Sequence, residues 1–306
     1  MRKLLFSLDP EISHNLTIKG LSFIKPVLLE IFNGRRVERT RVWNIEFLGK
    51  LGLAAGLDKN CDIGSLWGAF GFGFVEVGTI TPLPQRGNPR PRLFRLEREK
   101  ALINRMGFNN VGVKVAKERL LKDPRVVPVG INIGKNGDTP NDRAYEDYIF
   151  VLRQLYDLGD YFVLNVSSPN TEGLRELQKG ENLEVILGEI WRFRRGKPYK
   201  PVMVKLAPEI SGEDLEAIAK ICEKNDIDGV ILTNTLKVEN GGLSGKPLFE
   251  ISNARISEWV KISNIPVIGV GGIFSLRDVE KKLSFGAVLT QVYTGFVYRG
   301  WEIFQP

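Results

Sequence analysis

The chain has 306 residues, of which 43% are hydrophobic, so it can bury a large core as one α/β barrel or as two ordinary domains. A formal net charge of +7 favours an anionic partner but does not choose between a phosphate cofactor, an acidic metabolite, RNA and a lipid surface. The single histidine, His14, argues against a histidine-based triad or a zinc site. The two distant cysteines, Cys61 and Cys222, match no metal spacing and are typical of a reducing cytoplasmic compartment.

Residues 1–41 are expected to form a pair of helices that precedes the main domain. Asp9 can cap the first helix with Pro10 in its first turn, Pro26 separates it from the second, and Gly34 can end the second. Residues 1–41 combine an apolar face with eight Lys or Arg and only four Asp or Glu. An apolar face with an excess of cations suits helices lying on an anionic membrane surface. Packing on the chain's own main domain is the alternative. No segment has the roughly 20 apolar residues needed to span a bilayer, so a soluble or peripheral protein is expected.

From about residue 42 onward, short apolar segments alternate with helical ones, beginning with a hairpin arm at Val42 to Leu48. Helices are predicted between the strands, for example at Leu183–Trp191, Gly212–Lys224 and Ser275–Leu283. The predicted strands are Leu51–Ala55, Phe74–Val77, Val129–Ile133, Phe162–Val166, Val202–Leu206, Gly229–Thr233, Pro266–Val270 and Val288–Val292. Eight strands alternating with helices over about 250 residues predict a (β/α)8 TIM barrel at residues 42–306, with a doubly wound sheet as the alternative.

One connection, Thr79 to Arg125, is far longer than a barrel needs and is rich in Pro, Arg and Gly. It is predicted to be a functional insertion over one end of the barrel. It contains the segment from Asn104 to Asn110, in which four polar residues flank Phe108. Side-chain amides supply both donors and acceptors, which suits a planar, neutral ring.

Polar residues and glycines occupy the carboxyl end of almost every predicted strand, where barrels carry their chemistry. The segments are Gly56-Leu57-Asp58-Lys59, Gly78-Thr79, Asn132, Asn165 to Thr171, Lys205, Thr233-Asn234-Thr235, Gly269-Val270-Gly271-Gly272 and Tyr293-Thr294-Gly295. No cluster of acids or thiolates among them indicates a metal.

Individual strand ends indicate particular ligands. Gly271, Gly272 and Gly295 suit close approach of backbone N–H groups to a phosphate, or else tight turns that need a positive φ. Burying the charged ammonium groups of Lys59 and Lys205 at the rim would cost free energy unless an anion is near them. A ligand carboxylate or an electron-rich cofactor ring could supply that partner. Asp58 is an alternative internal partner for Lys59. The pattern therefore predicts a site for a phosphate-bearing cofactor and a heterocyclic, carboxylated substrate.

Six motifs in order resemble the signatures of the dihydroorotate dehydrogenases, specifically the membrane-associated, quinone-dependent class, and the resemblance covers the chain from about residue 5 to residue 300. They are Ala54-Ala55-Gly56-Leu57-Asp58-Lys59, Asn104-Arg105-Met106-Gly107-Phe108, Gly130-Ile131-Asn132-Ile133-Gly134-Lys135-Asn136, Asn165-Val166-Ser167-Ser168-Pro169-Asn170-Thr171, Gly241-Gly242-Leu243-Ser244-Gly245 and Gly269-Val270-Gly271-Gly272.

The resemblance implies an enzyme that oxidises dihydroorotate to orotate in de novo pyrimidine (UMP) synthesis, with FMN as cofactor. It implies that FMN is held by Ala55, Gly56, Thr79, Asn132, Asn165, Lys205, Thr233, Gly245, Gly272, Tyr293 and Thr294. It implies that the substrate is held by Lys59, Asn104, Arg105, Met106, Gly107, Phe108, Asn165, Asn170, Asn234 and Thr235.

The same resemblance assigns catalytic roles. Ser168 takes the place of the base that removes the C5 proton while a hydride passes from C6 to the flavin, and serine here, in place of the soluble class's cysteine, marks the quinone-dependent class. A serine hydroxyl is a weak base, so a proton path is needed, and Thr171 with an ordered water is the nearest candidate. Lys205 is expected to stabilise negative charge on the reduced flavin.

In the quinone-dependent class, a helical pair such as residues 1–41 forms the mouth of an apolar tunnel from the membrane to the flavin. The resemblance places His14, Arg95 and Tyr293 at the quinone head group. It implies a membrane quinone and an anionic lipid surface as partners, no nucleic acid, and a peripheral location on the cytoplasmic side of the cell membrane.

Two features depart from the family pattern. The segment from Thr235 to Gly241 is short, and the chain stops soon after Tyr298-Arg299-Gly300, so the last barrel helix is expected to be short or absent. Two other functions stay open from the residues: a flavin barrel acting on RNA, similar to dihydrouridine synthases, and a non-catalytic flavin- or lipid-binding barrel. Against the first, the fourth-strand loop of this sequence has no cysteine that could act as an acid, and no appended RNA-binding domain is recognised.

Overall fold

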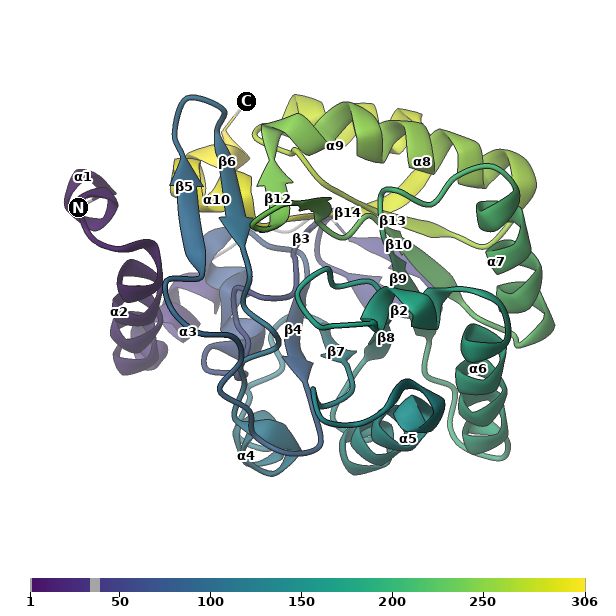
Figure 1. Cartoon of the computed structure of the whole chain (residues 1–306). Helices are drawn as coiled ribbons and strands as arrows, with labels where there is room; N and C mark the ends of the chain where they lie inside the picture. The colour runs from purple at the N-terminus through teal and green to yellow at the C-terminus, as the bar shows by residue number, and fades with distance from the viewer. Residues whose placement is uncertain (1, 34–38, 306) are drawn as a thin grey trace.

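Eight parallel strands close into a barrel in the computed structural model, which describes residues 2–33 and 39–305 (Figure 1). Each strand overlaps one of the eight predicted strands, so the TIM barrel is confirmed and the doubly wound sheet is wrong. In order around the barrel the strands are β10 (Gly229–Leu232), β13 (Val267–Val270), β14 (Ala287–Val292), β3 (Leu51–Leu53), β4 (Val75–Ile80), β7 (Val129–Ile133), β8 (Tyr161–Asn165) and β9 (Val202–Leu206).

Helices surround the barrel and follow its strands in the chain (Figure 1). They are α4 (Gly112–Leu120), α5 (Ala144–Leu155), α6 (Gly180–Arg194), α7 (Glu213–Lys224), α8 (Phe249–Ile262) and α9 (Leu276–Ser284), with 3₁₀ segments η1 (Gly64–Phe70), η2 (Asn141–Arg143), η3 (Leu174–Gln178) and η4 (Lys246–Leu248). Among the described residues, β14 is followed by the six-residue helix α10 (Thr294–Arg299) and by η5 (Gly300–Phe304), so the helix after the last strand is short, as expected.

A hairpin of β1 (Thr40–Val42) and β2 (Ile45–Phe47) closes the amino end of the barrel. The Trp43 indole donates a hydrogen bond to the carbonyl of Asp228, directly before β10. Phe47 is fully buried and packs edge-on against Phe74, 5.1 Å between ring centroids. This aromatic layer fills the bottom of the barrel and leaves the carboxyl end for a site.

The long insertion after β4 forms ordered structure over the carboxyl end, as predicted. Its hairpin, β5 (Leu93–Leu96) and β6 (Ala101–Asn104), pairs with β11 (Leu236–Val238) and β12 (Gly241–Gly245) in an antiparallel sheet of order β11-β12-β6-β5. Since β11 directly follows β10, this sheet stands above the strand ends. The short segment between Thr235 and Gly241 is accommodated as strand β11 and its turn into β12.

The N-terminal segment contains the two predicted helices, α2 (Pro10–Phe23) and α3 (Lys25–Asn33), and a short helix α1 (Arg2–Ser7) that was not predicted. Asp9 caps α2, its carboxylate accepting from the N–H groups of Glu11 and Ile12. Pro26 lies in the first turn of α3, and Gly34, the predicted end of that helix, lies outside the described residues.

These helices dock on the domain with one face and expose the other. Leu28 of α3 is buried, and α2 contacts β5, so in Figure 1 the N-terminal helices flank the β5–β6 hairpin. On the outer side, Ile12 and Leu16 are each 52% exposed and Phe23 is 89% exposed. The predicted packing on the chain's own domain is therefore confirmed for the inner face, and membrane contact of the outer face stays a prediction. Among the described residues, no helix is both long and apolar enough to cross a membrane.

Candidate active site

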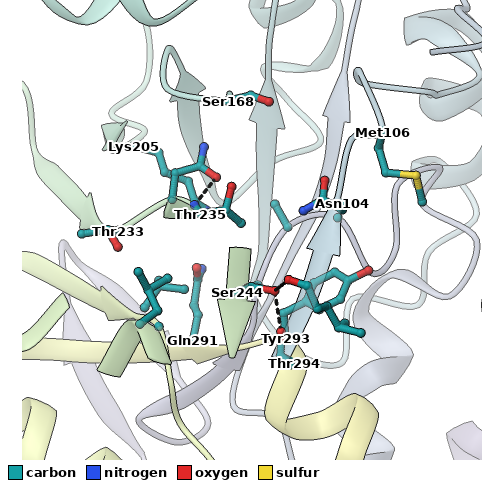
Figure 2. Close-up of a pocket in the computed structure, with 18 of the residues that line it drawn as sticks. Asn104, Met106, Ser168, Lys205, Thr233, Thr235, Ser244, Gln291, Tyr293 and Thr294 are labelled. Atoms are coloured by element: carbon teal, nitrogen blue, oxygen red, sulfur yellow. Dashed lines mark hydrogen bonds between the residues drawn. The ribbon is translucent and has the colours of Figure 1, made fainter. Parts of the chain in front are cut away.

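One pocket lies between the carboxyl ends of the barrel strands and the sheet above them (Figure 2). Figure 2 shows Ser168, Lys205 and Tyr293 on separate sides of it, with Asn104 and Met106 contributed by the insertion. The predicted residues that line it are Ala55, Gly56, Lys59, Thr79, Asn104, Met106, Gly107, Phe108, Asn165, Ser168, Asn170, Lys205, Thr233, Asn234, Thr235, Gly245, Gly272, Tyr293 and Thr294.

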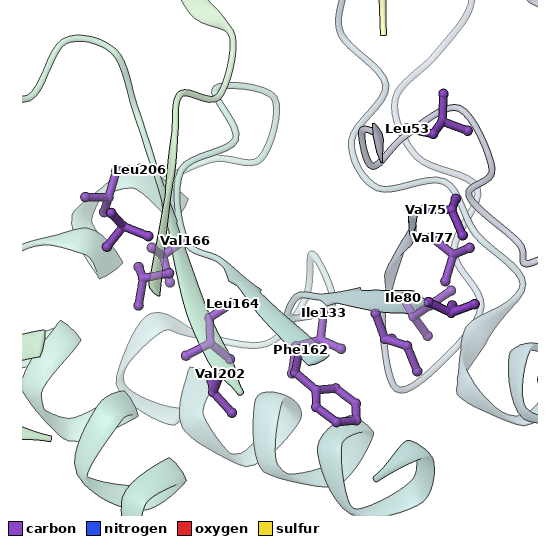
Figure 3. Packing of buried hydrophobic residues seen from close by; sticks show 14 of the residues in the cluster. Leu53, Val75, Val77, Ile80, Ile133, Phe162, Leu164, Val166, Val202 and Leu206 are labelled. Atoms are coloured by element: carbon purple, nitrogen blue, oxygen red, sulfur yellow. The ribbon is translucent and has the colours of Figure 1, made fainter. Parts of the chain in front are cut away.

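Strand alternation aims the polar side chains into this pocket. On β8, Phe162 and Leu164 pack outward in the core between barrel and helices, as Figure 3 shows, so Asn165 points inward. On the neighbouring strand β9, Lys205 is paired in register with Asn165. Two adjacent strands thus present an amide and an ammonium at the same level of the barrel.

A buried polar network forms the floor of the pocket around Glu76 of β4. The Lys205 ammonium lies 3.8 Å from the Glu76 carboxylate, and both side chains are almost completely buried. Asn132 and Gln291 each donate a side-chain amide hydrogen bond of 2.7 Å to that carboxylate. The ligand anion expected for Lys205 is therefore not required, because the protein supplies its own.

Asn165 is held by the same network from its other side. Its amide N–H donates to Thr79 Oγ1 at 3.0 Å and to Asn132 Oδ1 at 3.2 Å, and Thr79 Oγ1 donates to Asn132 Oδ1 at 2.5 Å. The Asn234 amide donates to Asn165 Oδ1 at 3.2 Å. Asn132 does not line the pocket but fixes two residues that do.

The loop that carries Ser168 is held by Arg175 in η3. Its guanidinium donates to the carbonyls of Ser167 and Thr235 at 3.1 and 2.9 Å, and it is ion-paired with Glu209 at 2.8 Å. Three loops, following β8, β9 and β10, are thereby joined. Ser168 is 6% exposed and its hydroxyl accepts a hydrogen bond from the N–H of Asn170.

The insertion reaches this loop through paired amides. Asn170 Nδ2 donates to Asn104 Oδ1 at 2.8 Å, and Asn88 Nδ2 donates to the carbonyl of Asn170. The Asn104 amide donates to the carbonyl of Gly242 in β12. Amides from the insertion and the fourth-strand loop thus meet at one wall of the pocket.

Lys59 is not paired with Asp58. The Asp58 carboxylate instead accepts from the N–H groups of residues 62–64 and the indole of Trp67, whereas the Lys59 ammonium donates to the carbonyl of Gly56. Burial lowers the pKa of Lys59 to about 8, and the carboxylates of Glu11 and Asp58 counteract part of that effect. The ammonium therefore faces the pocket without a carboxylate in direct contact among the described residues.

Gly271 and Gly272 take left-handed backbone conformations, with φ of +122° and +74°. A β-carbon on Gly272 would lie 2.4 Å from the β-carbon of Phe249, the first residue of α8. The tight-turn explanation is therefore correct for these two residues. Both glycines also line the pocket beside Gly295, so their role in a tight turn does not exclude a phosphate at this place.

Besides Asn132, four predicted residues lie outside the pocket lining. The Arg105 guanidinium donates to the carbonyl of Pro91, away from the pocket. Thr171 has a buried hydroxyl without a hydrogen-bond partner, just beyond the Ser168 loop. His14 and Arg95 lie at the docked N-terminal helices.

Arg95 ties those helices to the insertion. Its guanidinium donates to the carbonyls of Leu5, Phe6 and Leu8 and to the Ser13 hydroxyl. Burial and the nearby Lys59 ammonium lower the pKa of His14 to about 3, so its imidazole is neutral. Glu11 of α2 is ion-paired with Arg92 of the insertion at 2.7 Å, so α2 packs beside the segment that forms one wall of the pocket.

The model of one protein family, described as dihydroorotate dehydrogenase, matches residues 37–306. The chain belongs to the dihydroorotate dehydrogenase family. A relative from Nitrosomonas europaea named dihydroorotate dehydrogenase (quinone) is 44% identical over 99% of this chain and 94% of its own length. One of the same name from Gloeobacter violaceus is 44% identical over 99% of this chain and 90% of its own length.

Solved structures of family members have the same fold. The crystal structure of DHODH from Eimeria tenella in complex with ferulenol is 34% identical, with a TM-score of 0.84 over 96% of this chain and 88% of that chain. Its ligand-free form gives a TM-score of 0.85. The family resemblance drawn from the motifs is therefore confirmed.

Several residues that line or support the pocket of this dihydroorotate dehydrogenase family member were not predicted from the sequence. Glu76 and Gln291 were not selected, although each is a strongly polar residue within a largely apolar strand, which is a usable signal. Ser244, whose hydroxyl lies 2.8 Å from that of Thr294, was noted only within a motif. Arg175 gave no signal, because its partners are two backbone carbonyls and the carboxylate of Glu209, 34 positions away, and the fold alone brings them together.

Proposed function

We propose that the protein oxidises dihydroorotate to orotate in de novo pyrimidine synthesis, with FMN as the hydride acceptor and a membrane quinone as the final electron acceptor. The observation that carries the proposal is the meeting of Ser168, the Asn104–Asn170 amide pair and Lys205 around one pocket, in a chain of this family. The test is whether dihydroorotate reduces the protein's bound flavin without oxygen.

The pocket residues fit FMN. Among the described residues, Thr233 Oγ1 and Gln291 Oε1 are buried at the pocket without a hydrogen-bond partner, as are the side-chain oxygens of Asn109 and Asn170. Buried polar atoms are nearly always hydrogen-bonded in native proteins, so these atoms support a polar ligand. Thr79, Asn165, Lys205 and Thr233 would hold the flavin ring, and backbone groups near Gly272 and Gly295 would hold the phosphate.

Bound FMN would supply a two-electron acceptor for the hydride at C6 of dihydroorotate. The chain's own residues bind and orient the substrate and move its proton. Asn104, Asn170 and Asn234 would hold the planar ring through donors and acceptors, and Lys59 would bind the carboxylate. Ser168 would remove the C5 proton, and the buried Thr171 hydroxyl would receive it through water.

Lys59 gives the reaction a defined pH dependence. Its pKa of about 8 means that the ammonium loses its proton as pH rises through that value, and the attraction for the substrate carboxylate is lost with it. The KM for dihydroorotate should therefore rise by up to about tenfold per pH unit above pH 8, since only the protonated form binds. Steady-state assays from pH 6.5 to 9.5 measure this, and Lys59→Met should remove the dependence. A wild-type KM that stays constant to pH 9.5 would rule out this role.

The exposed apolar face of α2 would dock on an anionic membrane and admit the quinone. Replacing Ile12, Leu16 and Phe23 together by serine should weaken binding to anionic phospholipid vesicles by at least about tenfold, because each loses apolar burial. Quinone turnover should fall in parallel, while anaerobic flavin reduction by dihydroorotate stays unchanged. Vesicle sedimentation and stopped-flow absorbance measure the two effects.

The matched control is Leu121→Ser with Val185→Ser, which removes exposed apolar side chains from the barrel's outer surface. This control should bind vesicles normally. Deleting residues 1–41 is a poorer test, because Glu11 is buried in an ion pair with Arg92 at 2.7 Å. Vesicle binding that is equal in the triple variant and the wild type would contradict membrane docking through this face.

A further inference from the structure

The buried lysine of helix α9 has no role in the chemistry proposed above. Lys282 is 0% exposed, and its ammonium donates to Ser252 Oγ at 2.8 Å and to Asn253 Oδ1 at 2.9 Å. It lies 4.9 Å from the centroid of the Phe249 ring. These three partners belong to the first turns of α8, and all are neutral.

No carboxylate among the described residues forms an ion pair with Lys282. The nearest acids are occupied elsewhere: Asp278 accepts from the N–H of Phe274 and the Ser275 hydroxyl, and Glu250 lies 3.6 Å from Lys281. A buried ammonium without a counter-charge is costly. Burial lowers the pKa of Lys282 to about 7, although the carboxylates of Asp278 and Glu250 counteract part of that effect.

The partners of Lys282 connect it directly to the phosphate end of the pocket. The Ser252 hydroxyl that accepts from Lys282 donates to the carbonyl of Val270 at 2.6 Å, immediately before Gly271 and Gly272. A β-carbon on Gly271 would lie 3.1 Å from Ser252 Cβ, and one on Gly269 would lie 3.3 Å from Lys282 Cδ. One serine side chain therefore separates the ammonium from the rim where the phosphate would bind.

We propose that Lys282 is a positioning residue for the ligand phosphate: its positive charge, buried behind the Gly271–Gly272 turn, favours a phosphate dianion on the pocket side of that turn. This inference rests on the proposed FMN site. The phosphate supplies the counter-charge that the protein does not, and the Lys282–Ser252–Val270 chain fixes the turn that contacts it. Lys282 thus selects for the phosphorylated form of the flavin without touching it.

The test is the preference of the holoenzyme for FMN over riboflavin, which lacks the phosphate. The full-length protein is dialysed to equilibrium against a mixture of both flavins, and the bound flavins are separated and quantified. Lys282→Met should lower the FMN-to-riboflavin ratio by at least about tenfold, the size expected for opposite charges several ångströms apart in a protein interior. Riboflavin occupancy by itself should not fall.

Two further variants make the test specific. Lys282→Gln removes the charge but can still hydrogen-bond Ser252 and Asn253, so it should fold normally and lose the preference as Lys282→Met does. Lys281→Met removes the same charge from the exposed side of α9 and should keep the wild-type ratio. A wild-type ratio in Lys282→Gln would overturn the inference, whereas a wild-type protein that holds no FMN would overturn the proposed function instead.

Discussion

Replacing Ser168 by alanine should slow reduction of the bound flavin by dihydroorotate about a hundredfold to ten-thousandfold, the usual contribution of a general base. The Ser168 hydroxyl lines the pocket, and no histidine or carboxylate among the pocket's lining residues could replace it. Anaerobic stopped-flow absorbance measures the rate directly. Because alanine removes a single oxygen, orotate should still bind with nearly unchanged affinity, which shows that the site is intact.

Two companion variants locate the proton's path. Ser168→Cys restores a group that can lose a proton, so it should reduce flavin faster than Ser168→Ala. Thr171→Val removes the buried hydroxyl without a partner, and should slow reduction less than Ser168→Ala does. A Ser168→Ala enzyme that reduces its flavin at the wild-type rate would exclude Ser168 as the base.

Replacing Lys205 by methionine should have two large effects at once. Flavin reduction should slow by about two to three orders of magnitude, because a fixed cation no longer faces the developing negative charge. Unfolding free energy should fall by about 3–5 kcal/mol, because the fully buried Glu76 carboxylate loses its only cation within 4 Å among the described residues. Stopped-flow absorbance and denaturant unfolding measure the two effects separately.

The double variant Lys205→Met with Glu76→Gln separates structure from catalysis. The amide at position 76 needs no cation, and Gln291 can rotate to accept from it, since Gln291 Oε1 has no partner among the described residues. Most of the lost stability should return, while the slow reduction should remain. If both returned, Lys205 would act only as the partner of Glu76.

The barrel could be predicted from the sequence because parallel strands covered on both faces appear as short apolar runs. The eight runs were found in the right places, and polar residues at their ends indicated the site. The N-terminal cap at Asp9 and the break at Pro26 followed from local rules. These features depend on neighbours in the chain, which a sequence displays directly.

The features that were missed depend on contacts between distant segments. Glu76 matters because barrel closure brings Asn132, Lys205 and Gln291 around it. The Glu11–Arg92 ion pair joins residues that are 81 positions apart. The partner of Asp58 was also ambiguous, because the donors to its carboxylate are backbone N–H groups of a loop whose shape the sequence does not specify.

The most direct test of the proposed function is an anaerobic titration of the purified, FMN-loaded protein with dihydroorotate, followed by visible absorbance. The flavin band should bleach in proportion to added dihydroorotate, with one orotate formed per flavin reduced. A folded protein with full FMN occupancy whose absorbance does not change in excess dihydroorotate would contradict the proposed function.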